Sequence, residues 1–446
     1  MWARGTPKPD ASSSFRIDSN MSAIITKEIT SCETLPELET VFDEYAGSFC
    51  YINASAALVK YAKLRGSNIR SPFFSKLATI YLNRLPDSDI WGCTNVLWAC
   101  SKLGSAQHPV WTSTWQAFLE HVEKGLGEEK RPCLQPQQLS NVLYACAKLR
   151  QQPQPDELLL LLEAFAHPVV LSAAKPQEIA NVIWSLGLLS IAPDWQATGV
   201  SKELLQRLLA PELLVAVVSE GVPQAVSNVL VGLGRMCTGP SPLLSTAAAQ
   251  QYAGQLLSGV RLNRLSTWAP QHISNAMWAL GELQLKGEEF VQAAAAAAPV
   301  WLPKSTTFDL NQAATACAQL QYQDERFIGL LVQRGQQLLQ LDSSRRSKGR
   351  PVSEADRDSV AAMCCLSVVL LDMRGLAGAA RKLVVDSNIK QHSRTHPSNM
   401  RRLWVFHNWL LDHQLLDGKG LAGLLTQQQL QQGGKEAAAW GDKTRL

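Results

Sequence analysis

Apolar residues recur at helical spacing along most of this chain, and one amphipathic helix returns repeatedly. Its best copy, NVLYACAKL at residues 141–149, sets apolar side chains three and four positions apart. This spacing is typical of a helix that buries one face. Consecutive copies start 37 to 47 residues apart, so the chain is built from one repeated unit. Clear copies of this nine-residue signature begin at Asn95, Asn141, Asn181, Asn228 and Asn275, and weaker copies begin at Ala56 and Gln312.

The repeat length is typical of two-helix units of the armadillo and HEAT size class. Leu-rich segments between the signatures, such as residues 157–165 and 202–209, are expected to form the second helix of each unit. Proline at the first helical position presets the backbone without losing a hydrogen bond. We therefore predict an all-α, right-handed α-solenoid of about seven to eight two-helix repeats. Pro-Gln precedes four signatures at one register, at Pro136, Pro176, Pro223 and Pro270.

Composition divides the chain into five predicted segments. Residues 1–20 contain Ser, Pro and Arg and few acids, so they are expected to be a disordered N-terminus or the remnant of a transit peptide. They lack the apolar core of a signal peptide. Residues 21–341 form the repeat array, 342–356 a basic linker, and 357–425 C-terminal helical repeats or a cap. Residues 426–446 are predicted to be a disordered tail rich in Gln and Gly. The Ala run at 293–298 and the Gln-rich stretch at 427–432 are interpreted as loop or tail composition.

The sides of the signature helix differ when residues are placed about 100° apart. Leu139, Val142, Leu143 and Cys146 form an apolar stripe, which we expect to pack on the second helix of the unit. Both flanks carry small residues, and glycine inside a helix costs roughly 1 kcal/mol relative to alanine. Their recurrence predicts that each signature helix approaches a neighbour closely on either side. The glycines at these flanks are Gly187, Gly232, Gly234 and Gly281.

The fourth face, opposite the apolar stripe, carries amides, aromatic rings and cations at matching positions. We name it the amide–aromatic ladder and expect it to line a concave surface. Amides can hydrogen-bond base edges, aromatic rings can stack on bases, and Lys or Arg can contact phosphates. Alternatively, Asn bridges successive backbones and Trp is packed between units. Burial is the preferred interpretation for Trp, whereas both remain open for Gln and Asn. The ladder consists of Gln137, Gln177, Gln224, Gln271, Asn95, Asn141, Asn181, Asn228, Asn275, Trp98, Tyr144, Trp184, Trp278, Lys102, Lys148 and Arg235.

The net charge is only +4, but it is unevenly placed. Residues 343–402 carry a net charge of +7, and the remainder is acidic. A basic segment on a near-neutral body suits a polyanionic partner, although a solvated linker explains it equally well. The densest part, and a further set of candidate RNA contacts, is Arg345, Arg346, Lys348 and Arg350.

The ten cysteines form no CxxC pair. Cys100, Cys146 and Cys317 occupy one slot of the repeat, where other copies carry Leu. They are therefore interpreted as small hydrophobic residues, which favours a reducing compartment. No apolar stretch is long enough to predict a membrane span.

Motifs that carry catalysis are missing from the sequence: there is no GxxxxGK[ST], HExxH or GxSxG motif, and no dinucleotide-binding fingerprint in which GxGxxG joins a predicted strand to a helix. His392 and His396 have the spacing of one helical face, but Pro397 follows them. We interpret them as a solvated pair and not as a metal site. We predict that the protein is not an enzyme, and we expect no cofactor, metal, small-molecule substrate or membrane partner.

The pattern Pro-Gln-x-apolar-small-Asn-x-x-Trp-small-x-small-Lys-Leu resembles the octotricopeptide repeat of green-algal organelle proteins, a family allied to FAST kinase-like proteins. SNMRRLWVFHNWLLDHQ at residues 398–414 is similar to the helix that precedes a RAP domain in such proteins, although the RAP domain itself is not recognisable. The resemblance covers residues 51–414.

This resemblance implies sequence-selective binding of single-stranded organellar RNA, in support of transcript processing, stability or translation. Other RNA-processing proteins are expected as further partners. The expected location is the chloroplast stroma first and the mitochondrial matrix second. The alternative function is an armadillo-like protein-interaction scaffold whose Asn side chains hold an extended peptide.

Overall fold

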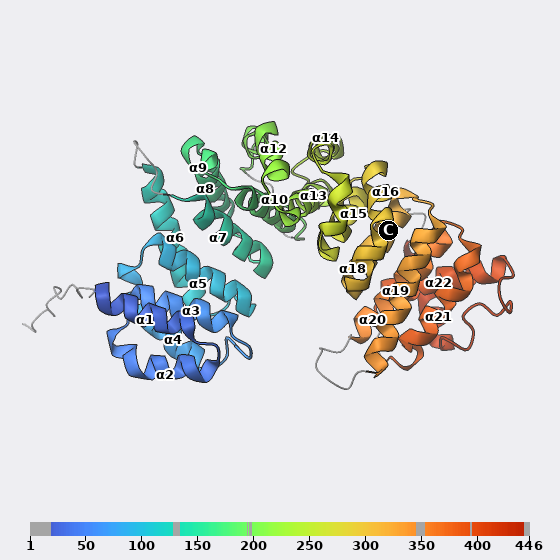
Figure 1. Cartoon of the computed structure of the whole chain (residues 1–446), viewed down its shortest axis with the longest axis horizontal. Helices are drawn as coiled ribbons and strands as arrows, with labels where there is room; N and C mark the ends of the chain where they lie inside the picture. Colours follow the sequence, from blue (N-terminus) through green and yellow to red (C-terminus); the bar gives the residue numbers. More distant parts are fainter. Residues whose placement is uncertain are drawn as a thin grey trace, which may run out of the picture. The chain divides into compact units, whose positions relative to one another are not determined.

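The computed structural model describes residues 19–127, 134–193, 195, 199–344, 353–392 and 395–440. Within these ranges the chain is helical, and the only β feature is an isolated bridge between Ala422 and Leu425. The predicted all-α class is therefore confirmed. The helices form two compact units, Met1–Ala173 and Ala174–Leu446, and Figure 1 labels most of the helices.

In the first unit the signature helices form one layer, because each packs against the next (Figure 1). The signature helices of this layer are α3 (Tyr51–Lys63), α5 (Ile90–Leu103) and α7 (Pro136–Leu149), and the layer begins with α1 (Ser19–Ser31), which carries no copy of the signature. The intervening helices are α2 (Leu35–Tyr45), α4 (Pro72–Arg84), α6 (Pro109–Gly127), α8 (Pro155–Phe165) and the short α9 (Pro168–Ser172), with 3₁₀ turns η1 (Ala46–Ser48) and η2 (Leu85–Asp87). Among them α4 contacts α6, and α6 contacts α8.

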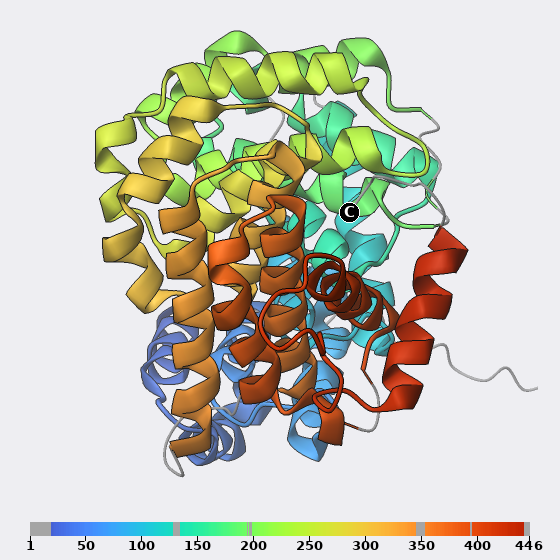
Figure 2. The same ribbon diagram turned by 90° about the vertical axis from the view of Figure 1, so that its right-hand side faces the viewer.

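The second unit repeats this arrangement. Its layer runs through the signature helices α10 (Pro176–Ser190), α13 (Pro223–Thr238), α15 (Pro270–Glu282) and α18 (Thr307–Leu320). It continues through α20 (Glu354–Leu370) and α22 (Pro397–Asp412), in which no copy of the signature was identified, and each helix is in contact with the next. The last helix, α23 (Gln427–Trp440), packs on α22. The intervening helices are α11 (Lys202–Leu208), α12 (Pro211–Ser219), α14 (Thr246–Ser258), α16 (Glu288–Ala296), α17 (Ala298–Trp301), α19 (Glu325–Ser344) and α21 (Ala377–Ser387). Short 3₁₀ turns are η3 (Leu262–Thr267), η4 (Leu302–Lys304), η5 (Arg374–Leu376) and η6 (Ile389–Gln391). Figure 2 shows the long helices α19 and α20 side by side.

The predicted helix starts are confirmed. Pro136, Pro176, Pro223 and Pro270 are each the first residue of a signature helix. Side chains of the first turn also satisfy backbone groups that a helix start leaves unpaired. The backbone N–H of Gln135 donates to Gln138 Oε1 at 2.9 Å, and the same bond joins Lys175 N–H to Glu178 Oε2 at 2.8 Å.

The apolar stripe is buried as predicted. Leu139, Val142, Leu143 and Cys146 are at most 1% exposed. The other two cysteines in this slot, Cys100 and Cys317, are equally buried, and burial raises the pKa of the Cys100 thiol to about 12. These thiols therefore remain protonated near neutral pH and act as small hydrophobic groups.

The small flanks do allow close approach between signature helices. A Cβ at Gly187 of α10 would lie 2.6 Å from the carbonyl oxygen of Gly232 in α13. A Cβ at Gly232 would in turn lie 2.5 Å from the carbonyl oxygen of Ile183. The next junctions are less tight. A Cβ at Gly234 would lie 3.6 Å from the Ala279 carbonyl oxygen, which is an ordinary van der Waals contact. A Cβ at Gly281 would overlap the side-chain oxygen of Gln319 and would lie 3.3 Å from the Cα of Ala316. No larger side chain fits between α10 and α13 without moving a backbone.

Two segments predicted to be loop or tail are instead helical. The Ala run at 293–298 lies in α16 and α17, which follows from alanine having the highest helix propensity. α23 occupies most of the predicted tail at 426–446. Its Gly433 sits so close to α22 that a Cβ there would lie 2.6 Å from the Met400 carbonyl oxygen. Packing on α22 thus stabilises a helix that composition alone disfavours.

The predicted linker at 342–356 lies mostly outside the described residues. α19 continues to Ser344, and α20 begins at Glu354 with the Ser353 hydroxyl as its N-cap. Arg345, Arg346, Lys348 and Arg350, the basic candidates, also lie outside the described residues.

The prediction for His392 is wrong. His396 is exposed, but the side chain of His392 is only 7% exposed. Its Nδ1 lies 2.6 Å from Oδ1 of Asp358, and Thr395 Oγ1 donates to Asp358 Oδ2 at 3.0 Å. Burial raises the pKa of the Asp358 carboxyl. The pair joins α20 to the segment before α22.

Candidate nucleic-acid interface

The amide–aromatic ladder lies on the solvent-facing side of the signature helices. In the first unit Asn95, Trp98, Asn141 and Tyr144 are half-buried, and Lys102, Gln137 and Lys148 are exposed. In the second unit Gln177, Asn181, Trp184, Asn228, Arg235, Asn275 and Trp278 are half-buried, and Gln224 and Gln271 are exposed. Each Trp therefore contacts the protein with part of its ring and keeps part of it accessible.

A row of lysines follows the first unit along one position of the signature. Lys63, Lys102 and Lys148 occupy the eighth position in α3, α5 and α7, and all three are exposed. None of them has an acidic ion-pair partner among the residues that the structure describes. Partial burial, and then the charge of Lys102, lower the pKa of Lys148. The row is thus a strip of positive charge that the described residues leave without an ion-pair partner.

Two of these lysines lie against a ladder aromatic. The Nζ atoms of Lys63 and Lys102 are each 5.4 Å from the ring centroid of Trp98. A cation at this distance from an indole ring is attracted by about 0.5–1 kcal/mol at an exposed site. The aromatic ring and the positive charges therefore form one composite surface on α3 and α5.

The same relation recurs in the second unit. The Arg235 guanidinium of α13 lies 5.5 Å from the ring centroid of Trp278 in α15. As with Lys63 and Trp98, the eighth residue of one signature helix contacts the fourth residue of the next. Elsewhere in this unit the eighth position holds Leu188, Glu282 and Gln319, so its charge differs from repeat to repeat.

The ladder asparagines do not bridge backbones. Asn181 accepts a hydrogen bond at 2.9 Å from Gln177 Nε2, one turn earlier on the same helix. Within the described parts of the chain, no side-chain hydrogen bond is formed by Asn95, Asn141, Asn228 or Asn275. Their amides point to the surface with both donors and acceptors available to water or to a ligand.

Sequence reasoning missed Lys63. The copy that begins at Ala56 lacks both the Pro-Gln start and the Asn, so its ladder face was not assigned. The signal was nevertheless present, since AALVKYAKL carries a lysine at the eighth position.

The described residues hold no group of three or more His, Cys, Asp or Glu side chains arranged for a metal ion. None of the helices within the described ranges has the length and apolar character needed to cross a bilayer. No protein-family model and no curated protein sequence matches the chain.

Proposed function

We propose that the protein binds single-stranded RNA along the amide–aromatic ladder, as a right-handed α-solenoid of seven to eight two-helix repeats and without catalysis of its own. The observation that carries this proposal is the row of Lys63, Lys102 and Lys148, which lies beside Trp98 and has no acidic partner in the described structure. Phosphates would supply the missing negative charge.

A single strand suits this surface better than a duplex. Half-exposed rings can stack only on bases that are free of their own stacking partners. The unbonded amides of Asn95, Asn141, Asn228 and Asn275 can donate to and accept from base edges. Because the eighth position varies in charge from repeat to repeat, neighbouring repeats would contact the strand differently, and selectivity for sequence would follow.

The resemblance of the signature to the octotricopeptide repeat supports the same function. On this basis we propose a role in the processing, stability or translation of organellar transcripts. The proposed location is the chloroplast stroma, with the mitochondrial matrix as the second choice. Other RNA-processing proteins would be further partners.

Filter-binding titrations of the full chain with labelled single-stranded RNA test the proposal. We expect saturable binding that weakens as monovalent salt is raised from about 50 to 200 mM, because each phosphate contact releases counterions. Replacing Lys63, Lys102 and Lys148 together with Gln should weaken binding. It should also flatten the plot of log affinity against log salt by about 2, which is three contacts at roughly 0.7 each for a single strand.

A matched control removes the same charge elsewhere. Lys76, Lys124 and Lys202 are exposed on α4, α6 and α11, the helices between signatures. Their joint replacement with Gln should leave the salt slope nearly unchanged. Equal effects of the two triple variants, or no saturable binding at low salt, would contradict the proposed function.

Ribonuclease treatment distinguishes the protein-interaction scaffold from an RNA-binding protein. An armadillo-like interaction protein would keep its co-purifying partners after ribonuclease treatment, whereas an RNA-binding protein would lose those that are tethered through RNA.

A further inference from the structure

Trp98 carries two ammonium groups on one ring. Lys63 reaches the ring from the preceding signature helix, α3, and Lys102 reaches it from the next turn of α5 itself. Each Nζ lies 5.4 Å from the ring centroid, so the two ammonium groups are no farther apart than twice this distance, although like charges repel. Both lysines are exposed and Trp98 is half-buried. The ring therefore gathers two cations at the junction of α3 with α5.

The contact with the ring also restricts the lysines. A lysine has a long, flexible stem, and fixing that stem on a ligand costs conformational entropy. The attraction between an ammonium group and the face of an indole ring limits the stem before any ligand arrives. Less entropy is then lost on binding, which is the usual benefit of a preorganised site.

The charge at this junction suits a phosphate. Neither Lys63 nor Lys102 has an acidic ion-pair partner among the residues that the structure describes. Lys102 also adds its charge to that of Lys148, the next lysine of the row, and this lowers the pKa of Lys148 after the larger effect of partial burial. A phosphodiester has two charged oxygens, which can accept hydrogen bonds from different ammonium groups.

We propose that Trp98 is a positioning residue that holds Lys63 and Lys102 as a clamp for the phosphates of the RNA strand. The inference rests on the proposed function for the strand. It assigns this ring to the backbone of the RNA and not to a stacked base. The strand would accordingly cross the first unit with its phosphates over the junction of α3 with α5.

The equivalent ring of the second unit provides a comparison. The Arg235 guanidinium of α13 lies 5.5 Å from the Trp278 ring centroid, as Lys63 lies over Trp98. One turn after Trp278, however, α15 carries Glu282, where α5 carries Lys102. A Cβ at Gly234 would lie 3.5 Å from the Cβ of Glu282, so this acidic residue lies against α13. The junction combines one cation with one carboxylate and has no surplus of positive charge.

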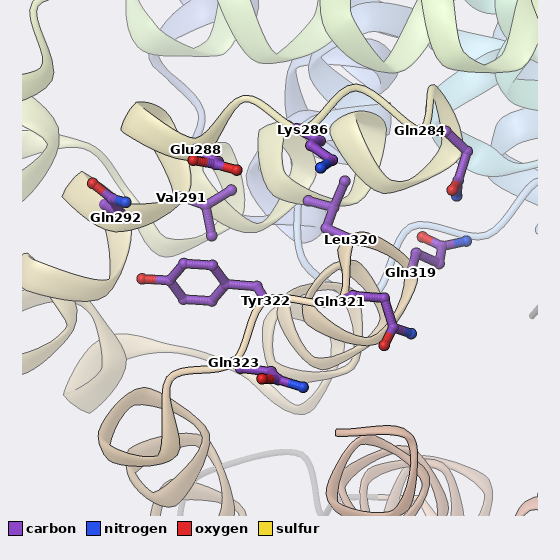
Figure 3. Close-up of a pocket in the computed structure, with 10 residues that line it drawn as sticks. All are labelled: Gln284, Lys286, Glu288, Val291, Gln292, Gln319, Leu320, Gln321, Tyr322 and Gln323. Atoms are coloured by element: carbon purple, nitrogen blue, oxygen red, sulfur yellow. The ribbon is translucent and has the colours of Figure 1, made fainter. Parts of the chain in front are cut away.

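The surface beside the next signature helix is also mixed in charge. A pocket of about 500 Å³ lies between the turn from α15 into α16 and the end of α18 (Figure 3). Gln319 lines it, and its Nε2 donates to Glu282 Oε1 at 2.9 Å, which fixes the orientation of the amide. Lys286 and Glu288 contribute one charge of each sign to the lining. A phosphate would meet no excess of cations here.

A double-mutant cycle on the full chain tests the clamp. The ligands are labelled oligouridylate and a ribose–phosphate strand of the same length that lacks bases. Trp98→Leu should weaken the binding of both strands by about fivefold, as expected for the loss of two exposed cation–ring contacts. Trp98→Phe should retain most of the affinity, because a phenyl ring also attracts cations. With Lys63→Gln and Lys102→Gln already in place, Trp98→Leu should change the affinity less than about 1.5-fold.

The controls separate positioning from stacking and from loss of structure. Thermal melts establish that each variant is folded, and a loss of stability common to both lysine backgrounds cancels in the cycle. Trp278→Leu should weaken binding less than about twofold, because its junction lacks the second cation. An effect of Trp98→Leu that persists without the two lysines, or that is missing with the strand lacking bases, would overturn the inference. RNA binding itself would remain intact in that case.

Two further ligands distinguish this inference from the proposed function. Inorganic tripolyphosphate presents phosphates alone. Binding of tripolyphosphate that depends on Trp98, without saturable binding of either strand, would support the clamp and refute the proposed function. Tighter Trp98-dependent binding of an oligoglutamate than of either strand would overturn the inference in favour of an acidic peptide.

Discussion

Two asparagines show how differently one residue type can be used in this chain. Asn53 is fully buried in α3, and its Nδ2 donates to the Ser22 carbonyl at 2.8 Å and to Thr26 Oγ1 at 2.9 Å. Asn141 in α7 is half-buried and forms no side-chain hydrogen bond in the described structure. The first links α3 to α1, and the second is available to a ligand.

We therefore expect opposite effects from the same substitution. Asn141→Ala and Asn228→Ala together should leave the free energy of unfolding within about 0.5 kcal/mol of wild type, because no side-chain hydrogen bond of the described structure is lost and alanine favours the helix. They should weaken RNA binding severalfold. Urea titrations and filter binding on the same preparations measure both.

Asn53→Ala is the control for this experiment. This substitution should lower the free energy of unfolding by about 1–3 kcal/mol, because the Ser22 carbonyl and the Thr26 hydroxyl on α1 lose the hydrogen bonds that Asn53 donates. A comparable loss of stability in the Asn141 and Asn228 variant would mean that these amides are structural after all.

At the scale of single residues, the sequence predicted what depends on helical periodicity alone. The solvent-facing ladder and the buried cysteine slot follow from angular position on one helix. The pairing of His392 with Asp358 could not be predicted, because these residues lie 34 positions apart and meet through a tertiary contact. The polarity of the Gln319 amide depends in the same way on Glu282 of the preceding signature helix.

Among the elements, the spacing of signature helices is set by their small flanks. Gly187 and Gly232 bring α10 and α13 into backbone contact, and Gly281 leaves room for the Gln319 side chain at the junction of α15 with α18. Each glycine weakens its own helix, so the close contact must more than offset that cost.

Gly232→Ala should therefore destabilise the protein by about 1–3 kcal/mol, because the added methyl group overlaps the Ile183 carbonyl. Gly254→Ala is the matched control. Gly254 is exposed in the interior of α14, and a Cβ there meets no atom within 4 Å. That variant should be stabilised by about 0.5–1 kcal/mol through helix propensity alone. Chemical denaturation measures the free energy of unfolding of both variants. Equal changes in the two variants would refute the packing argument.

Helix starts were predicted well because proline at the first position is a local signal, as at Pro136. α23 was missed because its stability comes from packing rather than from its own residues. Gly433 and Gly434 disfavour an isolated helix, yet they allow it to lie against Met400 and Trp404 of α22.

At the scale of the whole molecule, the main contacts between layer helices in the described ranges run from each helix to the next within either unit. Such a chain has no single central core, and its stability is close to a sum over repeats and their junctions. A disturbance at one junction should remain local.

Hydrogen exchange of the Gly232→Ala variant checks this expectation. Amide exchange should accelerate in α10, α13 and α15, which meet at the altered junctions. α1, α3 and α5 of the first unit should exchange as in the wild type. Uniform acceleration along the chain would show that it unfolds as one cooperative body instead.

The glycine contact between α10 and α13 also determines which mutations this chain tolerates. Extra residues in a surface connection add little entropic cost, since that cost grows only with the logarithm of loop length. A single methyl group at Gly232, by contrast, meets a backbone that cannot yield cheaply. Insertions and deletions should therefore collect between helices, where starts already vary from 37 to 47 residues. The ladder side chains of successive signature helices would therefore keep their alignment when the connections between helices change in length.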